Sequence, residues 1–327
     1  MPVMTVIEAV REAMREEMRR DSRVFIMGED IGARGGVFLA TDGFLQEFGE
    51  QRVIDTPLAE SSIAGIAIGA AVNGMRPIAE IEFADFVWPA MNQIVGVASR
   101  IRYGTNGTKF APMVVRMPYG GGVRGGLYHS QTIDVVFAHQ PGLIVIAPST
   151  PYDAKGLLKA AIRCDDPVVF LEHKRTYRLV KGDVPAEDYV LPIGRADVKR
   201  QGADLTAVTY GLMVHYCLEA ARKLEAEGIE VEVVDLRTLA PLDRETFLES
   251  VRKTSKAIVV HEDYHTYGVG AEIAATIAQD AFHDLDAPVV RLTGPDVPAM
   301  PFAPTLEAEF MLSPEKIASA MRELAAY

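Results

Sequence analysis

Short apolar runs that alternate with helix-like stretches constrain this chain more than any other feature. Runs such as MVVRM (113–117) and LIVIA (143–147) are mostly apolar, without the regular polar alternation of a half-exposed strand. Strands of this kind lie in parallel sheets that are covered by helices on both faces. The sequence therefore predicts an α/β protein with a doubly wound parallel sheet in its first half. The strand-like runs of that half are 24–27, 52–54, 77–81, 113–117, 143–147 and 167–172.

Helix-start signals precede several of the stretches between these runs. Thr5 and Glu8 have the spacing of a capping box, and apolar residues then recur every four positions from Val6 to Met18. Thr150 followed by Pro151 has the pattern of an N-cap and a first helical residue. We expect further helices over about 59–73, 86–101 and 151–163.

The alternation breaks between 173 and 204, where prolines and mixed charges replace it, and then resumes. We expect a first domain over 1–185, a linker over 186–204, and a smaller α/β domain over 205–327. The expected strands of the second domain are 205–210, 231–236, 257–261 and 288–292. Its expected helices are 213–227, 243–253, 270–283 and a last one from Ser313 nearly to Tyr327.

The charge balance narrows the classes of partner. The 327 residues include 33 basic and 45 acidic side chains, a net charge of −12. An acidic chain is a poor ligand for nucleic acids or anionic membranes, so we expect neither as a main partner. We find no uninterrupted apolar span and no signal-peptide pattern, and we expect a cytoplasmic protein. Cys164 and Cys217 show no CxxC spacing and are expected to be reduced thiols.

Glu60 is the most unusual acidic residue of the chain. It lies in VIDTPLAESSIAGIAIGAAV (53–72), where nearly every neighbour is apolar or small. A carboxylate in such surroundings is expected to be partly buried, and burial disfavours its charged form unless a partner compensates. Glu60 is therefore expected to be paired, hydrogen-bonded or functional.

The glycine-rich run 120–126 leaves two interpretations open. It follows a strand, but no helix begins inside it, so it lacks the form of a phosphate-binding loop. It is either a mobile surface loop or a loop that brings Arg124 and His129 over a site. Histidine next to a flexible loop suits proton transfer near neutral pH.

Other familiar site patterns are absent or weak. The chain has neither a G-x-x-x-x-G-K-[ST] loop nor a helix-opening G-x-G-x-x-G, which disfavours a nicotinamide dehydrogenase. The fragment HEDYH (261–265) follows an apolar strand and precedes glycines, which is a poor context for a zinc helix. No G-x-S-x-G elbow supports a serine hydrolase.

Several long motifs together carry a resemblance. Taken in order along the chain, they resemble the β subunit of E1, the thiamine-diphosphate-dependent component of the 2-oxoacid dehydrogenase complexes. The resemblance covers nearly the whole chain. The motifs are GEDIGARGGVF (28–38), RVIDTPLAESSIAGIAIGAA (52–71), EIEFADFVWPAMNQI (80–94), GGGVRGGLYHSQ (120–131), PSTPYDAKGLLKAAI (148–162) and EVVDLRTLAPLD (232–243).

The resemblance implies a pyrimidine-binding domain followed by a transketolase-type C-terminal domain. It also implies an α₂β₂ tetramer in which a GDG-containing α subunit holds the diphosphate and Mg²⁺. This chain has no GDG sequence, which agrees with that division of labour. The E2 lipoyl acyltransferase is the further partner that the resemblance implies.

Site residues follow from the resemblance position by position. Glu60 matches the glutamate that bonds N1′ of the aminopyrimidine and promotes its imino tautomer. Leu58 matches a residue whose backbone lies at that ring, and Phe86 matches an aromatic residue packed on it, often tyrosine in relatives. Glu29 is expected to line the same pocket. His129 matches a histidine linked to acyl transfer to lipoyl-lysine.

A potassium site is also implied, built mainly from backbone carbonyls. Such ligands leave little trace in side chains, so the sequence alone does not test it. The corresponding residues here are Met113, Ala161, Ile162, Cys164 and Asp166.

The reaction implied is oxidative decarboxylation of a 2-oxoacid with reductive acylation of a lipoyl group on E2. GGVF (35–38) and FADFVWPAMNQ (83–93) favour a branched-chain 2-oxoacid. TPLAESSIAGIAIG (56–69) and LEHK (171–174) recur in pyruvate enzymes too, so pyruvate, and next acetoin, remain alternatives. The alternative from another functional class is a non-catalytic assembly subunit, which would only bridge the α subunit to E2.

Overall fold

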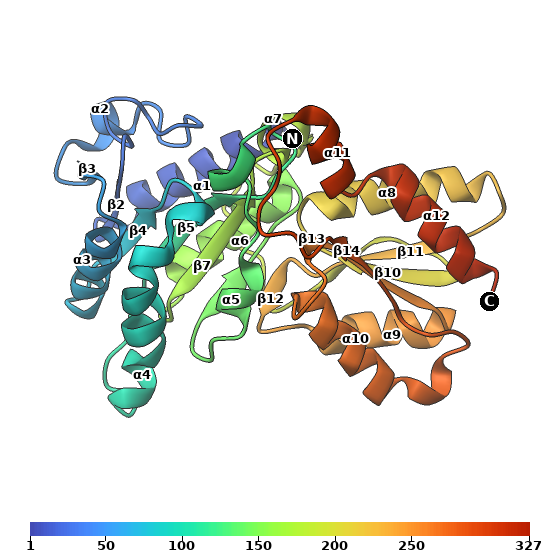
Figure 1. Ribbon diagram of the computed structural model, residues 1–327. Helices are drawn as coiled ribbons and strands as arrows, with labels where there is room; N and C mark the ends of the chain where they lie inside the picture. The colour runs from blue at the N-terminus through green and yellow to red at the C-terminus, as the bar shows by residue number, and fades with distance from the viewer. The chain divides into compact units, whose positions relative to one another are not determined.

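The computed structural model describes all residues from 1 to 327 and divides the chain into two compact units. Unit 1 comprises residues 1–119 and 136–193, and unit 2 comprises 120–135 and 194–327. The break at 193/194 falls inside the stretch 186–204 that was expected to be a linker. Segment 120–135, which was expected in the first domain, clusters with unit 2 because its hydrogen bonds run to that unit. Both units are drawn in Figure 1.

Unit 1 is built on parallel strands in the order β6-β7-β5-β4-β2-β3. Every residue of β2, β5 and β7 is buried, so the expected parallel sheet with two covered faces is confirmed. The strands are β2 (Val24–Gly28), β3 (Val53–Asp55), β4 (Arg76–Glu80), β5 (Val114–Tyr119), β6 (Ile144–Ile146) and β7 (Val168–His173). A separate antiparallel pair joins β1 (Val3–Thr5) to β8 (Lys181–Asp183).

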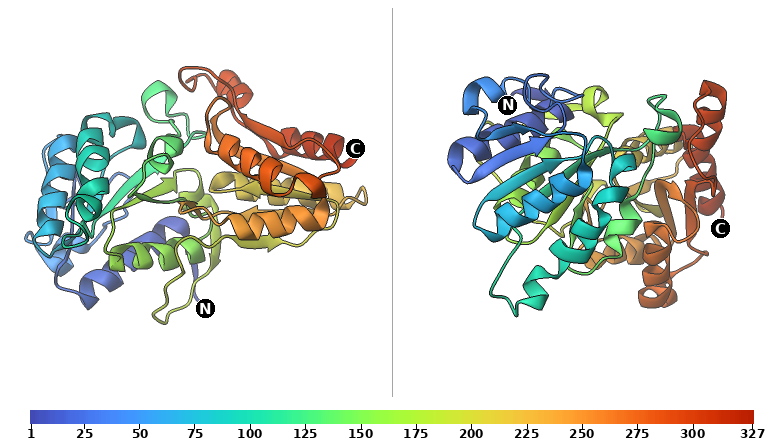
Figure 2. Two further views of the ribbon diagram at one scale, coloured as in Figure 1. Left: turned by 90° about the horizontal axis from the view of Figure 1, so that it is seen from below. Right: turned by 60° about the vertical axis from the view of Figure 1, so that its left-hand side comes forward.

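Helices α1 and α6 pack together on one face of this sheet (Figure 2). The apolar stripe from Val6 to Met18 is buried in their core, and the capping box of Thr5 and Glu8 is present. Thr150 caps α6 and Pro151 is its first residue, as expected. The helices of unit 1 are α1 (Val6–Arg20), α2 (Phe44–Phe48), α3 (Glu60–Val72), α4 (Ile101–Gly104), α6 (Pro151–Arg163) and α7 (Thr176–Leu179), while α5 (Asp134–Ala138) spans the 135/136 boundary.

The helix expected over 86–101 is present as a continuous helical run over 88–104, but of mixed type rather than as one regular α-helix. Its turns are η2 (Trp88–Ala90), η3 (Asn92–Val97) and η4 (Ala98–Arg100), preceded by η1 (Ala84–Phe86), and η2 and η3 pack beside α3. Two residues disfavour a regular α-helix here, because Pro89 lacks an N–H group and Gly96 weakens a helix. The turn η3, which contains Gly96, is π-helical. The segment that contains η2 and η3 lies along α3 (Figure 2).

Unit 2 contains a five-stranded sheet in the order β14-β13-β10-β11-β9. Only β9 is antiparallel; it pairs with β11 at the edge and lies within the expected linker. Helices α8 and α12 cover one face, and α9 and α10 cover the other (Figure 1). The strands of this sheet are β9 (Asp197–Arg200), β10 (Leu205–Thr209), β11 (Val231–Asp235), β13 (Ala257–Tyr264) and β14 (Val290–Gly294), and the short β12 (Thr238–Ala240) lies outside it.

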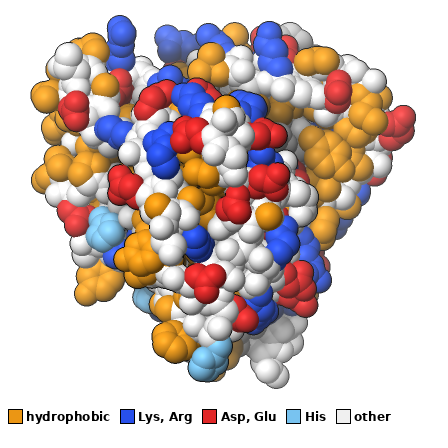
Figure 3. All heavy atoms as spheres, turned by 90° about the vertical axis from the view of Figure 1, so that its right-hand side faces the viewer, with side chains coloured by type: hydrophobic (Ala, Val, Ile, Leu, Met, Phe, Trp, Pro, Cys, Tyr) orange, Lys and Arg blue, Asp and Glu red, His pale blue; other side chains and the backbone are white.

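Four helices of unit 2, α8, α9, α10 and α12, agree with the spans expected from the sequence to within a few residues, whereas the short η5, η6 and α11 were not anticipated. They are η5 (Gly126–Tyr128), α8 (Leu212–Glu225), α9 (Arg244–Thr254), α10 (Val269–Asp280), η6 (Phe282–Asp284), α11 (Pro304–Phe310) and α12 (Pro314–Ala325). On the face seen in Figure 3, acidic and basic side chains are interspersed with apolar ones. Across the whole chain, no helix combines the length and the apolar character needed to cross a bilayer.

Candidate active site

Glu60 begins α3, directly beyond the carboxyl end of β3. Its side chain is 9% exposed, and no ion pair or hydrogen-bond donor of the chain engages its carboxylate. Ligands of parallel α/β sheets bind at the carboxyl ends of the strands. A buried acid without a protein partner at this edge is therefore the group of unit 1 best placed to meet a ligand.

Two more of the expected residues lie near Glu60. Glu29 follows β2, and the N–H group of Thr56 donates to the carbonyl of Gly28 (2.9 Å), which ties the ends of β2 and β3 together. Burial raises the pKa of Glu29, and the nearby charge of Glu60 raises it further. Leu58, two residues before Glu60, is 78% exposed, so its side chain is open to a ligand or another chain.

Phe86 belongs to a group of aromatic rings. Phe83 lies between Phe38 and Phe86, with ring centroids 5.7 Å from Phe38 and 6.3 Å from Phe86, and Phe38 in turn contacts Tyr177 (5.0 Å). Edge-on and tilted contacts at these separations are favourable for aromatic pairs. Phe86 is half-buried, and its contact with Phe83 fixes it beyond the end of β4.

A buried ionic network under this edge was missed at the level of sequence. Arg116 of β5 donates to Glu80 of β4 (2.5 Å) and to Glu172 of β7 (2.6 and 2.7 Å), and Tyr177 donates to Glu172 (2.7 Å). Burial raises the pKa of Glu80, and the two carboxylates keep the pKa of Arg116 well above its usual range. The sequence did contain a signal for this network, because charged residues inside fully buried strands must be paired with one another.

Glu82 adds a titratable carboxyl to the same region. Its Oε1 accepts a hydrogen bond from the N–H group of Val37 (3.2 Å), in the loop after β2. Burial, and then the charge of Glu80, raises the pKa of Glu82 to about 7. The carboxyl therefore changes charge near neutral pH while it contacts this loop.

His129 lies in unit 2, exposed and directly after η5. The glycine-rich run that precedes it is not simply mobile surface: Gly121 donates its N–H to Glu262 (2.6 Å), and Arg124 donates its N–H to Glu307 (3.0 Å). The run is therefore held by hydrogen bonds within unit 2, and the second interpretation, a loop that brings Arg124 and His129 over a site, stays a prediction. Glu60, Glu29, Leu58 and Phe86 all belong to unit 1.

The carbonyls expected to bind potassium already accept hydrogen bonds. Arg76 Nη1 donates to the carbonyls of Ile162 (2.9 Å) and Cys164 (2.8 Å). Met113 accepts from Val168 and Ala161 accepts from Cys164, while the Asp166 carboxylate pairs with Arg102. Since a guanidinium already supplies positive charge at two of these carbonyls, the group does not fit a potassium ion as an open cage.

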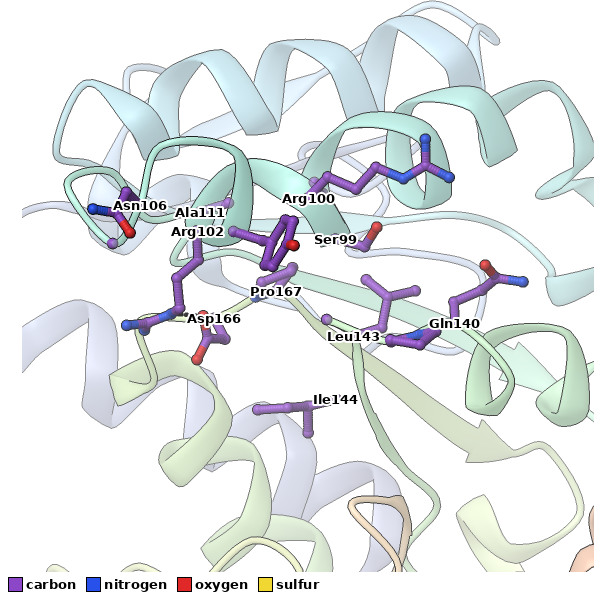
Figure 4. Close-up of a pocket in the computed structure, with 15 residues that line it drawn as sticks. Ser99, Arg100, Arg102, Asn106, Ala111, Gln140, Leu143, Ile144, Asp166 and Pro167 are labelled. Carbon is purple, nitrogen blue, oxygen red and sulfur yellow. Dashed lines mark hydrogen bonds and ion pairs between the residues drawn. The ribbon is translucent and has the colours of Figure 1, made fainter.

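A cavity of about 1250 Å³ lies elsewhere in unit 1, between the turns around 98–111 and the start of β6. Figure 4 shows Arg102 and Asp166 facing each other at its edge, and they form an ion pair of 2.5 Å. None of Glu60, Glu29, Leu58 or Phe86 lines it. The size of this cavity therefore does not identify the candidate active site.

Comparisons with known proteins agree with the two-unit architecture. The pyrimidine-binding domain of transketolase matches residues 3–180, and the C-terminal domain of transketolase matches residues 194–317. One solved structure, a split-gene transketolase described as an inactive β4 tetramer, has a TM-score of 0.79 and 25% identity. The match covers 99% of this chain and 98% of that one.

Curated relatives are similar over the whole length. The 2-oxoisovalerate dehydrogenase subunit beta of Bacillus subtilis is 60% identical over 327 residues, 100% of both chains. The pyruvate dehydrogenase E1 component subunit beta of the same organism is 50% identical over 93% of both chains. The chain belongs to the family of 2-oxoacid dehydrogenase E1 β subunits, thiamine-diphosphate enzymes with transketolase-like domains.

Proposed function

We propose that this chain, together with an α subunit, catalyses oxidative decarboxylation of a branched-chain 2-oxoacid of the 2-oxoisovalerate type. The lipoyl group of an E2 acyltransferase is the acceptor of the acyl group. The observation that carries the choice of substrate is the 60% identity to a 2-oxoisovalerate dehydrogenase subunit beta, against 50% to a pyruvate dehydrogenase subunit. Pyruvate is the second candidate because that lower identity still extends over 93% of the chain.

The residues at the ends of β2, β3 and β4 fit the aminopyrimidine end of thiamine diphosphate. Bound there, the cofactor supplies the nucleophilic carbon for attack on the 2-oxo group. Glu60 would hold a proton at N1′ of the ring, a task that suits a buried carboxyl without a competing protein partner. Phe86 would pack on the ring, the backbone at Leu58 would lie along it, and Glu29 would line the pocket.

The diphosphate and its Mg²⁺ are assigned to the α subunit in this proposal. This chain has no GDG sequence, and it contains no cluster of His, Cys, Asp or Glu side chains suited to a metal ion. The name of the split-gene transketolase, an inactive β4 tetramer, offers a precedent for a β chain that is incomplete without its partner. We assign the α₂β₂ tetramer to the cytoplasm.

Potassium is proposed only for the lone pairs that remain at the oxygens of Met113, Ala161, Ile162, Cys164 and Asp166, because Arg76 already donates to the carbonyls of Ile162 and Cys164. A bound ion stabilises the folded state by mass action. Equal melting temperatures of the tetramer in K⁺ and in Na⁺ would contradict the proposal of a potassium site.

The experiment that tests the function is CO₂ release from 3-methyl-2-oxobutanoate and from pyruvate, with thiamine diphosphate and Mg²⁺ present. It is run on this chain alone and on the chain co-expressed with its α partner. We expect turnover only with the partner, and a higher kcat/KM for the branched substrate. Faster turnover of pyruvate would favour the second candidate, and an assembled but inactive tetramer would favour the bridging role.

His129 is proposed to act in transfer of the acyl group to the lipoyl group. We expect His129→Ala to lower lipoyl acylation about 100-fold, the scale of general acid–base catalysis, while decarboxylation measured with an artificial electron acceptor falls much less. Single-turnover assays of both half-reactions make the comparison. Equal losses in the two assays would contradict this role.

A further inference from the structure

The loop that follows β2, residues 29–41, is folded back on itself. Gly36 donates its N–H to the carbonyl of Asp30 (2.9 Å), and the Thr41 hydroxyl donates to the carbonyl of Ile31 (2.6 Å). These bonds lie within the loop and give it a shape of its own. Its place relative to the sheet of unit 1 therefore depends on contacts with other elements.

Two carboxylates provide such contacts, one at the end of each strand that flanks β2. Asp55, the last residue of β3, accepts from the N–H groups of Gly32 (2.6 Å) and Ala33 (3.3 Å). Glu82, two residues beyond the end of β4, accepts from the N–H group of Val37 (3.2 Å). The loop is thus attached on both sides of β2 at the carboxyl edge of the sheet.

The bond from Val37 is the polar contact that Glu82 makes within the chain. Its carboxyl group forms no ion pair with a basic side chain. Burial, and then the charges of Glu80, Asp30 and Glu29, raise its pKa to about 7. Because the charges that act on Glu82 belong to other acids, it contributes here as an acceptor for the loop rather than as half of an ion pair.

An aromatic contact lies directly beside this hydrogen bond. Phe38 follows Val37 in the loop, and its ring meets that of Phe83, the residue after Glu82, with centroids 5.7 Å apart. Phe83 in turn contacts Phe86, with centroids 6.3 Å apart. The polar and the aromatic contact together join the loop to the turn that carries Phe86.

We propose that Glu82 is a positioning residue, which accepts from the N–H group of Val37 and so holds loop 29–41, with Glu29, against the turn that carries Phe86. Glu82 acts through the loop and is assigned no contact with the cofactor. The consequence for cofactor binding rests on the proposed function, whereas the attachment of the loop does not.

The first test is hydrogen–deuterium exchange of peptides covering 34–41, measured on the α₂β₂ complex at pH 7.5. Glu82→Ala removes the acceptor, and loss of one ordinary hydrogen bond predicts exchange about fivefold faster. Glu82→Gln keeps a side-chain oxygen for Val37 and should exchange no more than about twofold faster than the wild type. Glu50→Ala replaces an exposed acid without a hydrogen bond or ion pair and is the matched control. Peptides covering α6 should exchange equally in all four proteins.

The second test is the KM for thiamine diphosphate on the same four complexes. We expect Glu82→Ala to raise this KM about fivefold, with a smaller change in kcat, and Glu82→Gln to restore it. A residue that only stabilised the fold would not separate KM from kcat in this way.

Unchanged exchange of 34–41 in Glu82→Ala overturns the proposal, and so does equal acceleration in Glu82→Ala and Glu82→Gln. If exchange behaves as expected but the KM does not change, the attachment stands and the assigned part of the loop in the cofactor pocket fails. If the wild-type complex turns over neither 2-oxoacid, the proposed function fails, and the exchange rates alone decide the role of Glu82.

Discussion

At the scale of single residues, Glu60 combines burial with the absence of a partner. Burying a carboxyl without a hydrogen bond costs free energy, so such a residue persists where a ligand completes it. The same reasoning separates Glu60 from Glu80, which is more deeply buried but is paired with Arg116. Of the acids at this edge of the sheet, Glu60 therefore has the strongest claim to act on a bound cofactor.

Replacing Glu60 by Gln tests that claim. We expect kcat for decarboxylation to fall by about 100-fold or more, since the amide cannot transfer the proton. The melting temperature of the tetramer should not fall, because no protein contact is lost. Turnover above a tenth of the wild-type rate would exclude Glu60 as the proton carrier.

Glu82 makes stability depend on pH. Its pKa in the folded chain is raised to about 7, so its stabilising contribution is complete below the ordinary pKa near 4.5 and is lost as the pH rises toward 7. Glu82→Gln keeps an acceptor for Val37 and does not titrate. We expect the variant and the wild type to melt together at pH 5 and the variant to melt higher at pH 8. A constant difference across this range would contradict the assignment.

At the scale of elements, β4, β5 and β7 are joined by more than backbone hydrogen bonds. Arg116 links Glu80 and Glu172 on the two neighbouring strands, and all three side chains are buried. Removing one member of a buried ionic group leaves uncompensated charge, which costs more than the group contributes as a whole.

Arg116→Met should therefore destabilise the chain by about 3–5 kcal/mol. Urea unfolding followed by far-UV circular dichroism measures the change. The matched control adds Glu80→Gln and Glu172→Gln to the same chain, which removes the stranded charges and should recover most of the loss. If the triple variant is no more stable than Arg116→Met, lost packing rather than charge explains the effect.

The elements that the sequence predicted well depend on local signals. The capping box of Thr5, the Thr150–Pro151 start of α6 and the apolar stripe of α1 act within one or two turns of helix. The pairing of Arg116 with Glu80 and Glu172 and the bond from Tyr210 to Asp134 join residues far apart along the chain, and no periodic pattern encodes such contacts. The segment 86–101 is helical as predicted but departs from a regular α-helix, since Pro89 lies in a 3-10 turn and Gly96 in a π-helical turn.

At the scale of the whole molecule, unit 2 is assembled from two stretches of chain separated by part of unit 1. The shorter stretch, 120–135, contributes no strand and has its polar contacts with Glu262, Glu307 and Tyr210 of the longer one. The segment that bears His129 thus depends on residues at least 75 positions further along the chain. Local order in this segment is a property of the complete chain.

A fragment ending at residue 193 tests this dependence. It retains the strands of unit 1 but leaves segment 120–135 without Tyr210, Glu262 and Glu307, so we expect trypsin to cut after Arg124 at least about tenfold faster than in the full chain. Cleavage requires local unfolding of the cut region, so the rate reports the lost attachments. Cleavage after Lys159 in the buried face of α6 serves as the control and should stay slow in both. Equal rates after Arg124 would mean that the segment is ordered by unit 1 itself, whereas fast cutting after Lys159 would mean that unit 1 needs unit 2 in order to fold.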